Sequence, residues 1–200
     1  GASIGAISAS GDPRRIAVDA QQAPNFVHFD LPYLYRWEYG EENMLKESVA
    51  QLERMIAYEA PGNIAAILLE GESGSSGCLQ YPKGYLKAVR EICDKHGILL
   101  IMDEVMSGFG RTGKWFGFQN HDIVPDMICM AKGLTCGYLP FGCLMVSDKI
   151  AAKYDDNVLA LGLTYSAHPV SCAAALATLK IYEDDGLIEN TVTMGKYMEE

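Results

Sequence analysis

Short apolar runs that alternate with longer amphipathic segments limit the fold of this chain more than any other feature. These runs have the length of single strands and occupy residues 64–69, 98–103, 126–131 and 142–146. Because their centres are continuously apolar, we expect strands that are buried on both faces. Strands separated by helices predict an α/β protein with a mostly parallel sheet flanked by helices.

The helices are predicted from apolar residues at helical spacing, from a proline at a first position and from glycine at a C-terminal stop. They cover residues 43–59, 83–96, 168–184 and 187–200. A short strand is also expected at 25–30. The last helix is still running at Glu200 and the chain begins abruptly at Gly1, so we expect a fragment of a longer protein.

Charge and composition argue against several classes of function. The net charge of −10 disfavours a nucleic-acid partner, because phosphate backbones attract basic surfaces. The apolar runs are too short to cross a bilayer, and the first residues lack the basic part of a signal peptide. The six cysteines form no CxxC pair and are expected to be small buried hydrophobes in a reducing compartment. The cysteines thus favour a cytoplasmic protein. The four histidines lack metal-ligand spacing, so we expect no metal site.

Two charged residues, Asp103 and Lys132, directly follow apolar runs. Ligands bind at the carboxyl ends of the strands in parallel sheets. Spacing alone leaves two interpretations open, because such charges can also simply mark the return of the chain to solvent. A lysine in apolar surroundings has a lowered pKa and can act as an amine nucleophile. A carboxylate beside it is the usual partner of the pyridinium nitrogen of pyridoxal phosphate.

The sequence around these two residues favours the second interpretation. Residues 103–113 read DEVMSGFGRTG, residues 126–134 read DMICMAKGL, and residues 164–169 read TYSAHP. In this order and spacing they resemble the DEVxxGFGRTG, PDxxxxAKGLT and TYSGHP segments of class III aminotransferases, the ω-aminotransferase group. The resemblance extends over essentially the whole chain.

The resemblance implies a role for individual positions. Lys132 would be the catalytic lysine that forms the Schiff base with pyridoxal 5′-phosphate and moves a proton between substrate and cofactor. Asp103 would pair with the pyridine nitrogen, and Val105 would pack on one face of the ring. Thr164 would bind the cofactor phosphate of a neighbouring subunit, which implies a homodimer. Glu70 matches the family's glutamate at the end of the first apolar run.

This chain departs from the family pattern at three positions. Gly71 stands where proline usually follows the glutamate. Ser75 stands where some members place a glutamate that covers a substrate-binding arginine, so we do not expect the carboxylate switch used with 2-oxoglutarate. Met106 replaces a glutamine that reaches the cofactor's phenolic oxygen in some relatives. The glycine-rich stretch 108–117 lacks the spacing of a nucleotide-binding loop and is expected to be a turn region.

The resemblance also implies a domain and an activity. Residues 1–200 would be part of the large, cofactor-binding domain of a fold-type-I enzyme, with the upstream part and the C-terminal small domain absent. The parent enzyme would transfer an amino group from an amine or ω-amino acid to a keto acid such as pyruvate. A same-family aminomutase, racemase or decarboxylase would share these motifs. A non-catalytic fragment is the other alternative, because the stacking aromatic, the upstream phosphate-binding residues and the substrate arginine are not in the chain.

Overall fold

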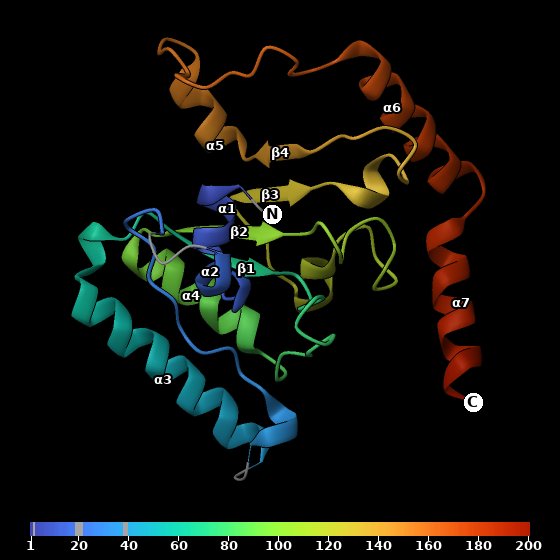
Figure 1. The fold of residues 1–200 in the computed structure, drawn as a ribbon. Coiled ribbons are helices and arrows are strands. Elements are labelled where there is room, and N and C mark those ends of the chain that lie inside the picture. Colours follow the sequence, from blue (N-terminus) through green and yellow to red (C-terminus); the bar gives the residue numbers. More distant parts are fainter. Residues whose placement is uncertain (2, 19–21, 38–39) are drawn as a thin grey trace.

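A single four-stranded sheet forms the centre of the chain (Figure 1). The computed structural model describes residues 1, 3–18, 22–37 and 40–200. The strands lie in the order β1-β2-β3-β4, with β1, β2 and β3 parallel and β4 antiparallel at the edge. Their bounds are β1 (Ala66–Glu70), β2 (Leu99–Asp103), β3 (Met127–Met130) and β4 (Cys143–Val146). The predicted α/β class with a mostly parallel sheet is confirmed.

Helices connect and flank the strands, and the four predicted helices are all present. The α-helices are α1 (Ile4–Ala9), α2 (Arg14–Val18), α3 (Glu41–Glu59), α4 (Tyr85–His96), α5 (Asp148–Ala151), α6 (Pro169–Asp184) and α7 (Leu187–Glu199). The 3-10 helices are η1 (Leu34–Arg36), η2 (Pro61–Asn63), η3 (Gly117–His121), η4 (Lys132–Leu134) and η5 (Ala152–Tyr154). No helix in these ranges is both long and apolar enough to cross a membrane.

The strand predicted at 25–30 is wrong. This stretch pairs with no strand in the described part of the chain. Asn25 has a φ of +70°, in the left-handed region, which interrupts an extended strand. Phe26 and Val27 are exposed, so this stretch does not bury its apolar side chains against the sheet.

One face of the sheet carries the core, and α3 and α4 pack on it. The buried side chains on this face are Ile67, Leu69, Leu100, Met102, Ile128 and Met130, and they join one cluster with the buried residues of the two helices. On the opposite face Leu68 is 42% exposed, and its neighbours in β2 and β3 are half-buried. The expectation that the strands are buried on both faces is therefore wrong, because the described helices cover only one face well.

The cysteines are less uniform than predicted. All six are free thiols. Cys93 is buried in α4, and burial raises its pKa to about 11. Cys78, Cys136 and Cys143 are exposed, so the prediction of buried cysteines is wrong for these three. They lie in loops and on the open edge strand, where the helices do not cover them.

Candidate active site

Two carboxylates end neighbouring strands and lie side by side. Glu70 and Asp103 are direct register partners at the last positions of β1 and β2, and Asp103 pairs in turn with Cys129 of β3. Because paired residues of parallel strands project to the same side, all three point to the less covered face. Burial and then the charge of Asp103 raise the pKa of the Cys129 thiol. The carboxyl ends of three strands thus present a polar edge, as predicted.

Asp103 is held by the residue two positions later. Its Oδ1 accepts a hydrogen bond of 3.0 Å from the backbone N–H of Val105. This short loop fixes the side-chain torsion and brings Val105, which is half-buried, next to the carboxylate. Among the described residues, Oδ2 of Asp103 has no hydrogen-bond donor, so it is available to an N–H group that approaches the sheet edge.

Lys132 begins the turn that follows β3. Its φ of +41° is unusual for a residue with a side chain and costs conformational energy, which is common at functional sites. The turn is closed by hydrogen bonds from Leu134 N–H to Ala131 O (2.9 Å) and from Thr135 N–H to Lys132 O (3.3 Å). The Lys132 side chain is exposed. The expected apolar surroundings are therefore not supplied by the described residues.

Two aromatic residues pack against this turn. The hydroxyl of Tyr182, in α6, donates a hydrogen bond of 3.2 Å to the carbonyl oxygen of Gly133. Phe109 packs against Gly133 so closely that a Cβ there would lie 2.9 Å from the Phe109 Cβ. The rings of Phe109 and Tyr182 stack with their centroids 6.1 Å apart. Burial and the hydrogen bond with Cys136 raise the pKa of Tyr182 to about 12, so the phenol stays protonated and able to donate.

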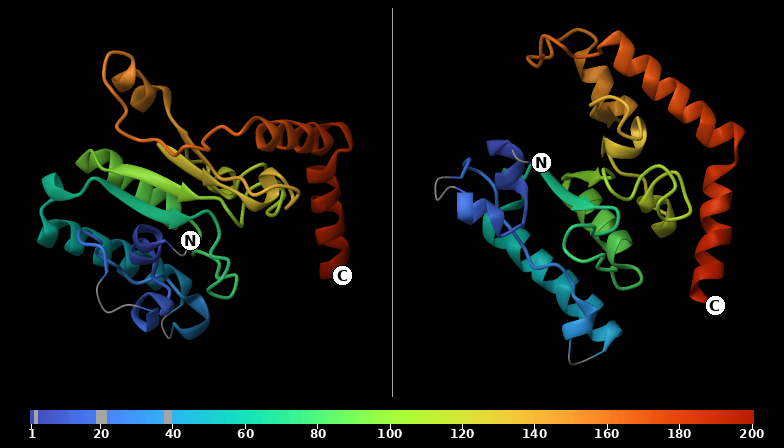
Figure 2. Two further views of the ribbon diagram at one scale, coloured as in Figure 1. Left: turned by 45° about the horizontal axis from the view of Figure 1, so that its top comes forward. Right: turned by 45° about the vertical axis from the view of Figure 1, so that its right-hand side comes forward.

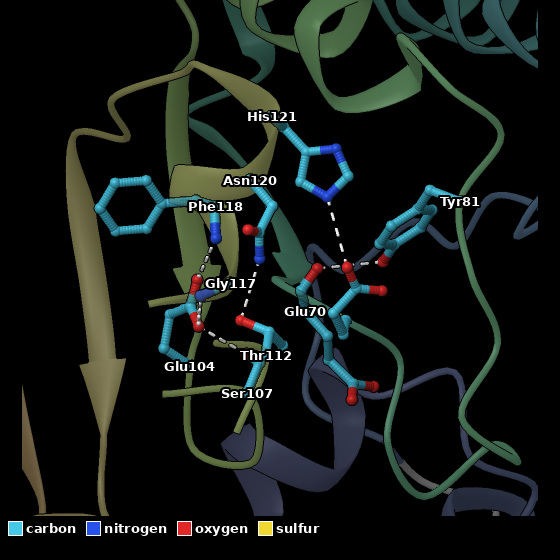
Figure 3. Close-up of polar contacts among 10 residues, drawn as sticks. Glu70, Tyr81, Glu104, Ser107, Thr112, Gly117, Phe118, Asn120 and His121 are labelled. Carbon is cyan, nitrogen blue, oxygen red and sulfur yellow. Dashed lines mark hydrogen bonds and ion pairs between the residues drawn. The ribbon is translucent and has the colours of Figure 1, made fainter. Parts of the chain in front are cut away.

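Glu70 is tied to the loop that follows it. Its Oε2 accepts a hydrogen bond of 2.7 Å from Gly74 N–H. Its carbonyl oxygen accepts one of 3.1 Å from the Tyr81 hydroxyl (Figure 3). Met106 lies over Gly74, because a Cβ on that glycine would be 2.6 Å from the Met106 Cε. The structure thus brings Glu70 beside Asp103 and leaves an apolar side chain between the two loops.

Thr164 does not join this group. It lies in the segment between α5 and α6, at the top of Figure 1, where residues 151–170 are all exposed. The described residues therefore place Glu70 and Asp103 side by side at strand ends, with Val105 and Lys132 in the segments that follow β2 and β3, and place Thr164 elsewhere. The described part of the chain has no cluster of three or more side chains suited to hold a metal.

Glu104 was missed by the sequence analysis. It lies between Asp103 and Val105, is 0% exposed, and its carboxylate accepts three hydrogen bonds (Figure 3). A signal was present, because a second acidic residue follows the strand and precedes a glycine-rich stretch. That stretch is a turn region as predicted, with positive φ at Phe109, Gly110 and Gly113.

Comparison with known proteins identifies the group to which this geometry belongs. The family profile described as aminotransferase class-III matches residues 1–200. The chain belongs to the class-III aminotransferases. An omega-aminotransferase of Caulobacter vibrioides is 47% identical over 154 residues, which are 74% of this chain and 35% of that protein. A taurine–pyruvate aminotransferase of Bilophila wadsworthia is 37% identical over 202 residues, which cover 98% of this chain and 44% of that protein.

Solved structures of other transaminases share the fold. The taurine:2-oxoglutarate aminotransferase of Bifidobacterium kashiwanohense, solved in complex with PLP and glutamate, superposes with a TM-score of 0.96 at 43% identity, covering 100% of this chain and 46% of that one. An (S)-enantioselective omega-transaminase of Thermomicrobium roseum gives a TM-score of 0.91 at 42% identity, covering 98% of this chain and 44% of that one. The chain therefore spans less than half the length of these relatives.

Proposed function

We propose that the protein containing this chain is a pyridoxal-phosphate-dependent transaminase. It transfers an amino group from an amine or ω-amino acid to a keto acid such as pyruvate. The observation that carries the proposal is the edge formed by β2 and β3. There, Asp103 keeps one carboxylate oxygen without a donor among the described residues, and the neighbouring strand leads into the strained turn of Lys132.

The residues at this edge fit pyridoxal phosphate. The cofactor requires a carboxylate for its ring nitrogen, an amine for its carbonyl carbon and apolar surface for its ring. Asp103, Lys132 and Val105 supply these three chemistries from two adjacent strand ends. When bound, the cofactor acts as an electron sink for the substrate carbon that loses its proton.

Each residue then has a defined task. Asp103 would hold a proton on the ring nitrogen through its free Oδ2. Lys132 would hold the cofactor through its amine and, once that amine is free, would move a proton at the substrate Cα. Val105 would offer apolar surface to the ring. Glu70 borders the site beside Asp103, with its Oε2 anchored to its own loop.

Thr164 and the assembly belong to the same proposal. Thr164 is exposed, as a hydroxyl that binds the phosphate of a neighbouring subunit would be before that subunit is added. We place residues 1–200 in the large, cofactor-binding domain of a cytoplasmic homodimer. The named relatives support the domain assignment alone, because this chain matches less than half of their own length.

The acceptor is proposed from two loop residues. Ser75 stands where some members of the family have a glutamate that is used with 2-oxoglutarate. Met106 stands where some have a glutamine that reaches the phenolic oxygen of the cofactor. A smaller keto acid such as pyruvate needs no second carboxylate partner, which favours it here. Relatives named for pyruvate and for 2-oxoglutarate both resemble this chain, so the two acceptors are the informative pair to compare.

Replacing Lys132 tests the proposal in the full-length enzyme. Lys132→Ala should abolish cofactor fixation by borohydride and lower amino transfer by about a thousandfold or more, which is ~4 kcal/mol. Lys46→Ala, an exposed lysine on α3, is the matched control and should behave like the wild type. Asp103→Ala should cost several kcal/mol, and Asp103→Glu should recover part of it. Substantial turnover by Lys132→Ala without an added amine would overturn the assignment.

A further inference from the structure

Glu104 is a fully buried carboxylate placed between two residues of the proposed site. Its Oε2 accepts hydrogen bonds from the Ser107 hydroxyl (2.5 Å) and from Gly117 N–H (2.8 Å), and its Oε1 accepts one from Phe118 N–H (2.9 Å) (Figure 3). Ser107 lies in the turn after β2, and the two amides are at the start of η3. The side chain therefore fastens the far end of a long loop to the end of β2.

The backbone of Glu104 is anchored as firmly as its side chain. Its N–H donates to Cys129 O of β3 (2.9 Å), and its carbonyl oxygen accepts from Gly108 N–H (2.9 Å). The Glu104 backbone is therefore held through both its N–H and its carbonyl oxygen. Every displacement of Glu104 would consequently move Asp103 before it or Val105 after it.

Gly71, which directly follows β1, also lies against the Glu104 carboxylate. A Cβ on Gly71 would overlap Oε1 of Glu104 and lie 2.7 Å from its Cδ. A Cβ on Gly117 would lie 3.2 Å from the carbonyl carbon of Gly71 and 3.3 Å from Glu104 Oε2. The segments that follow β1 and β2 and the start of η3 thus converge on one carboxylate, and a Cβ on Gly71 would require that carboxylate to move.

We propose that Glu104 is a positioning residue that fixes the orientation of Asp103 and Val105. The inference rests on the proposed function for the use of those two residues, but the geometry is independent of it. The hydrogen bond from Val105 N–H to Asp103 Oδ1 requires the backbone between them to keep one conformation. Glu104 is that backbone, and its buried bonds are costly to break because each leaves a polar group without a partner.

Two substitutions disturb the carboxylate in different ways. Glu104→Gln keeps the shape but turns an NH₂ group towards donors from Ser107, Gly117 or Phe118. Gly71→Ala keeps the carboxylate chemically unchanged, but the added Cβ would overlap it and force it to move. The matched controls are Glu47→Gln, on the exposed side of α3, and Gly62→Ala, where a Cβ would meet nothing within 4 Å.

The first measurement is amide hydrogen exchange in the cofactor-free full-length protein. Both Glu104→Gln and Gly71→Ala should speed exchange at Val105, Gly117 and Phe118 by about tenfold. The amides of Gly117 and Phe118 donate to the altered or displaced side chain, and Val105 N–H donates to Asp103, whose orientation it fixes. The controls should leave these rates unchanged. This readout does not depend on catalysis, and either variant alone suffices if the other fails to fold.

The second measurement is made on the loaded enzyme. The visible circular dichroism of the bound cofactor should weaken and kcat should fall by about tenfold, with KM for the keto acid unchanged. A wild-type enzyme that takes up no cofactor would refute the proposed function, while the exchange rates would still decide the role of Glu104. Unchanged exchange at Val105 in both variants would overturn the inference.

Discussion

The region from β1 to β3 and the region from β4 to α6 are built differently. In the first, α3 and α4 cover one face of the sheet, and Leu100, Met102 and Val89 are completely buried. In the second, β4 is exposed on both faces, and no residue from 151 to 170 is buried. This segment extends away from α3 and α4 (Figures 1 and 2). Both regions are apolar in sequence, so composition alone does not separate them.

The second region exposes several large apolar side chains. Those between β4 and the start of α6 are Leu144 (54%), Met145 (49%), Tyr154 (45%), Val158 (88%), Leu159 (50%), Leu161 (77%), Leu163 (81%), Tyr165 (82%) and Val170 (59%). The strand-end residues Glu70 and Asp103 therefore rest on a core made by the described chain, whereas Thr164 lies in a segment that the described residues leave exposed.

The largest expected effect is on the free energy of unfolding, when a buried leucine of the first region is shortened to alanine. The same change at an exposed leucine of the second region is the comparison. Leu100→Ala should lower the free energy of unfolding by about 2–5 kcal/mol, because the cavity lies in a tightly packed core. Leu161→Ala should change it by less than about 0.5 kcal/mol. Urea denaturation of this chain measures both. Equal losses would break the comparison and indicate that copies of the chain cover Leu161 in solution.

Asp126 offers a test of intermediate size, because it joins α4 to the start of β3. Its Oδ2 accepts from Arg90 Nη1 (2.8 Å) and from Leu100 N–H (2.8 Å). Burial alone would raise the pKa of Asp126, but these two donors outweigh it and hold the pKa below its ordinary value. Asp126→Asn should cost about 1–3 kcal/mol at neutral pH.

The pH dependence follows from the direction of that shift. A carboxyl group with a lowered pKa in the folded state contributes stability above its unfolded pKa, about 3.9, and loses it as the pH falls through the folded pKa. The difference between wild type and Asp126→Asn should therefore shrink below about pH 4. Asp156→Asn, in the exposed region, is the control and should show no such convergence. A constant difference across the acid range would contradict the assignment.

The smallest effect is expected where the two regions meet. Tyr182→Phe removes the hydrogen bond to Gly133 O while keeping the ring against Phe109, which should cost about 0.5–1.5 kcal/mol. Tyr197→Phe changes a phenol that is 71% exposed and should be neutral. Chemical denaturation compares the two. A neutral Tyr182→Phe would mean that ring packing alone attaches α6 to the Lys132 turn.

The strands and long helices were predictable because their signals are local. A continuous apolar run predicts a strand, and a proline at a first position indicates where α6 begins. The burial of each face was not predictable, because it depends on which helices return to the sheet. The stretch 25–30 shows the same limit, since its apolar residues suit a strand but pair with no strand of the sheet.

The candidate site was predictable to the extent that it follows strand ends. Asp103 and Lys132 are in sequence where parallel strands stop, so their shared edge follows from topology. The hydrogen bonds of Glu104 were not predictable, because its partners lie up to fourteen residues away in a loop without periodicity. The exposure of Lys132 was also missed, since apolar neighbours in sequence are not always neighbours in space.

The antiparallel direction of β4 has a consequence for how the protein can change over time. Met130 pairs with Cys143, so the connection that contains Lys132 leaves and re-enters the sheet at the same edge. The links from β1 to β2 and from β2 to β3 must instead return along the whole length of the strands. Insertions beyond Val146 would accumulate at the far edge and leave the Lys132 turn untouched. The fold thereby keeps the length of the chain after Val146 independent of the geometry of the Lys132 turn.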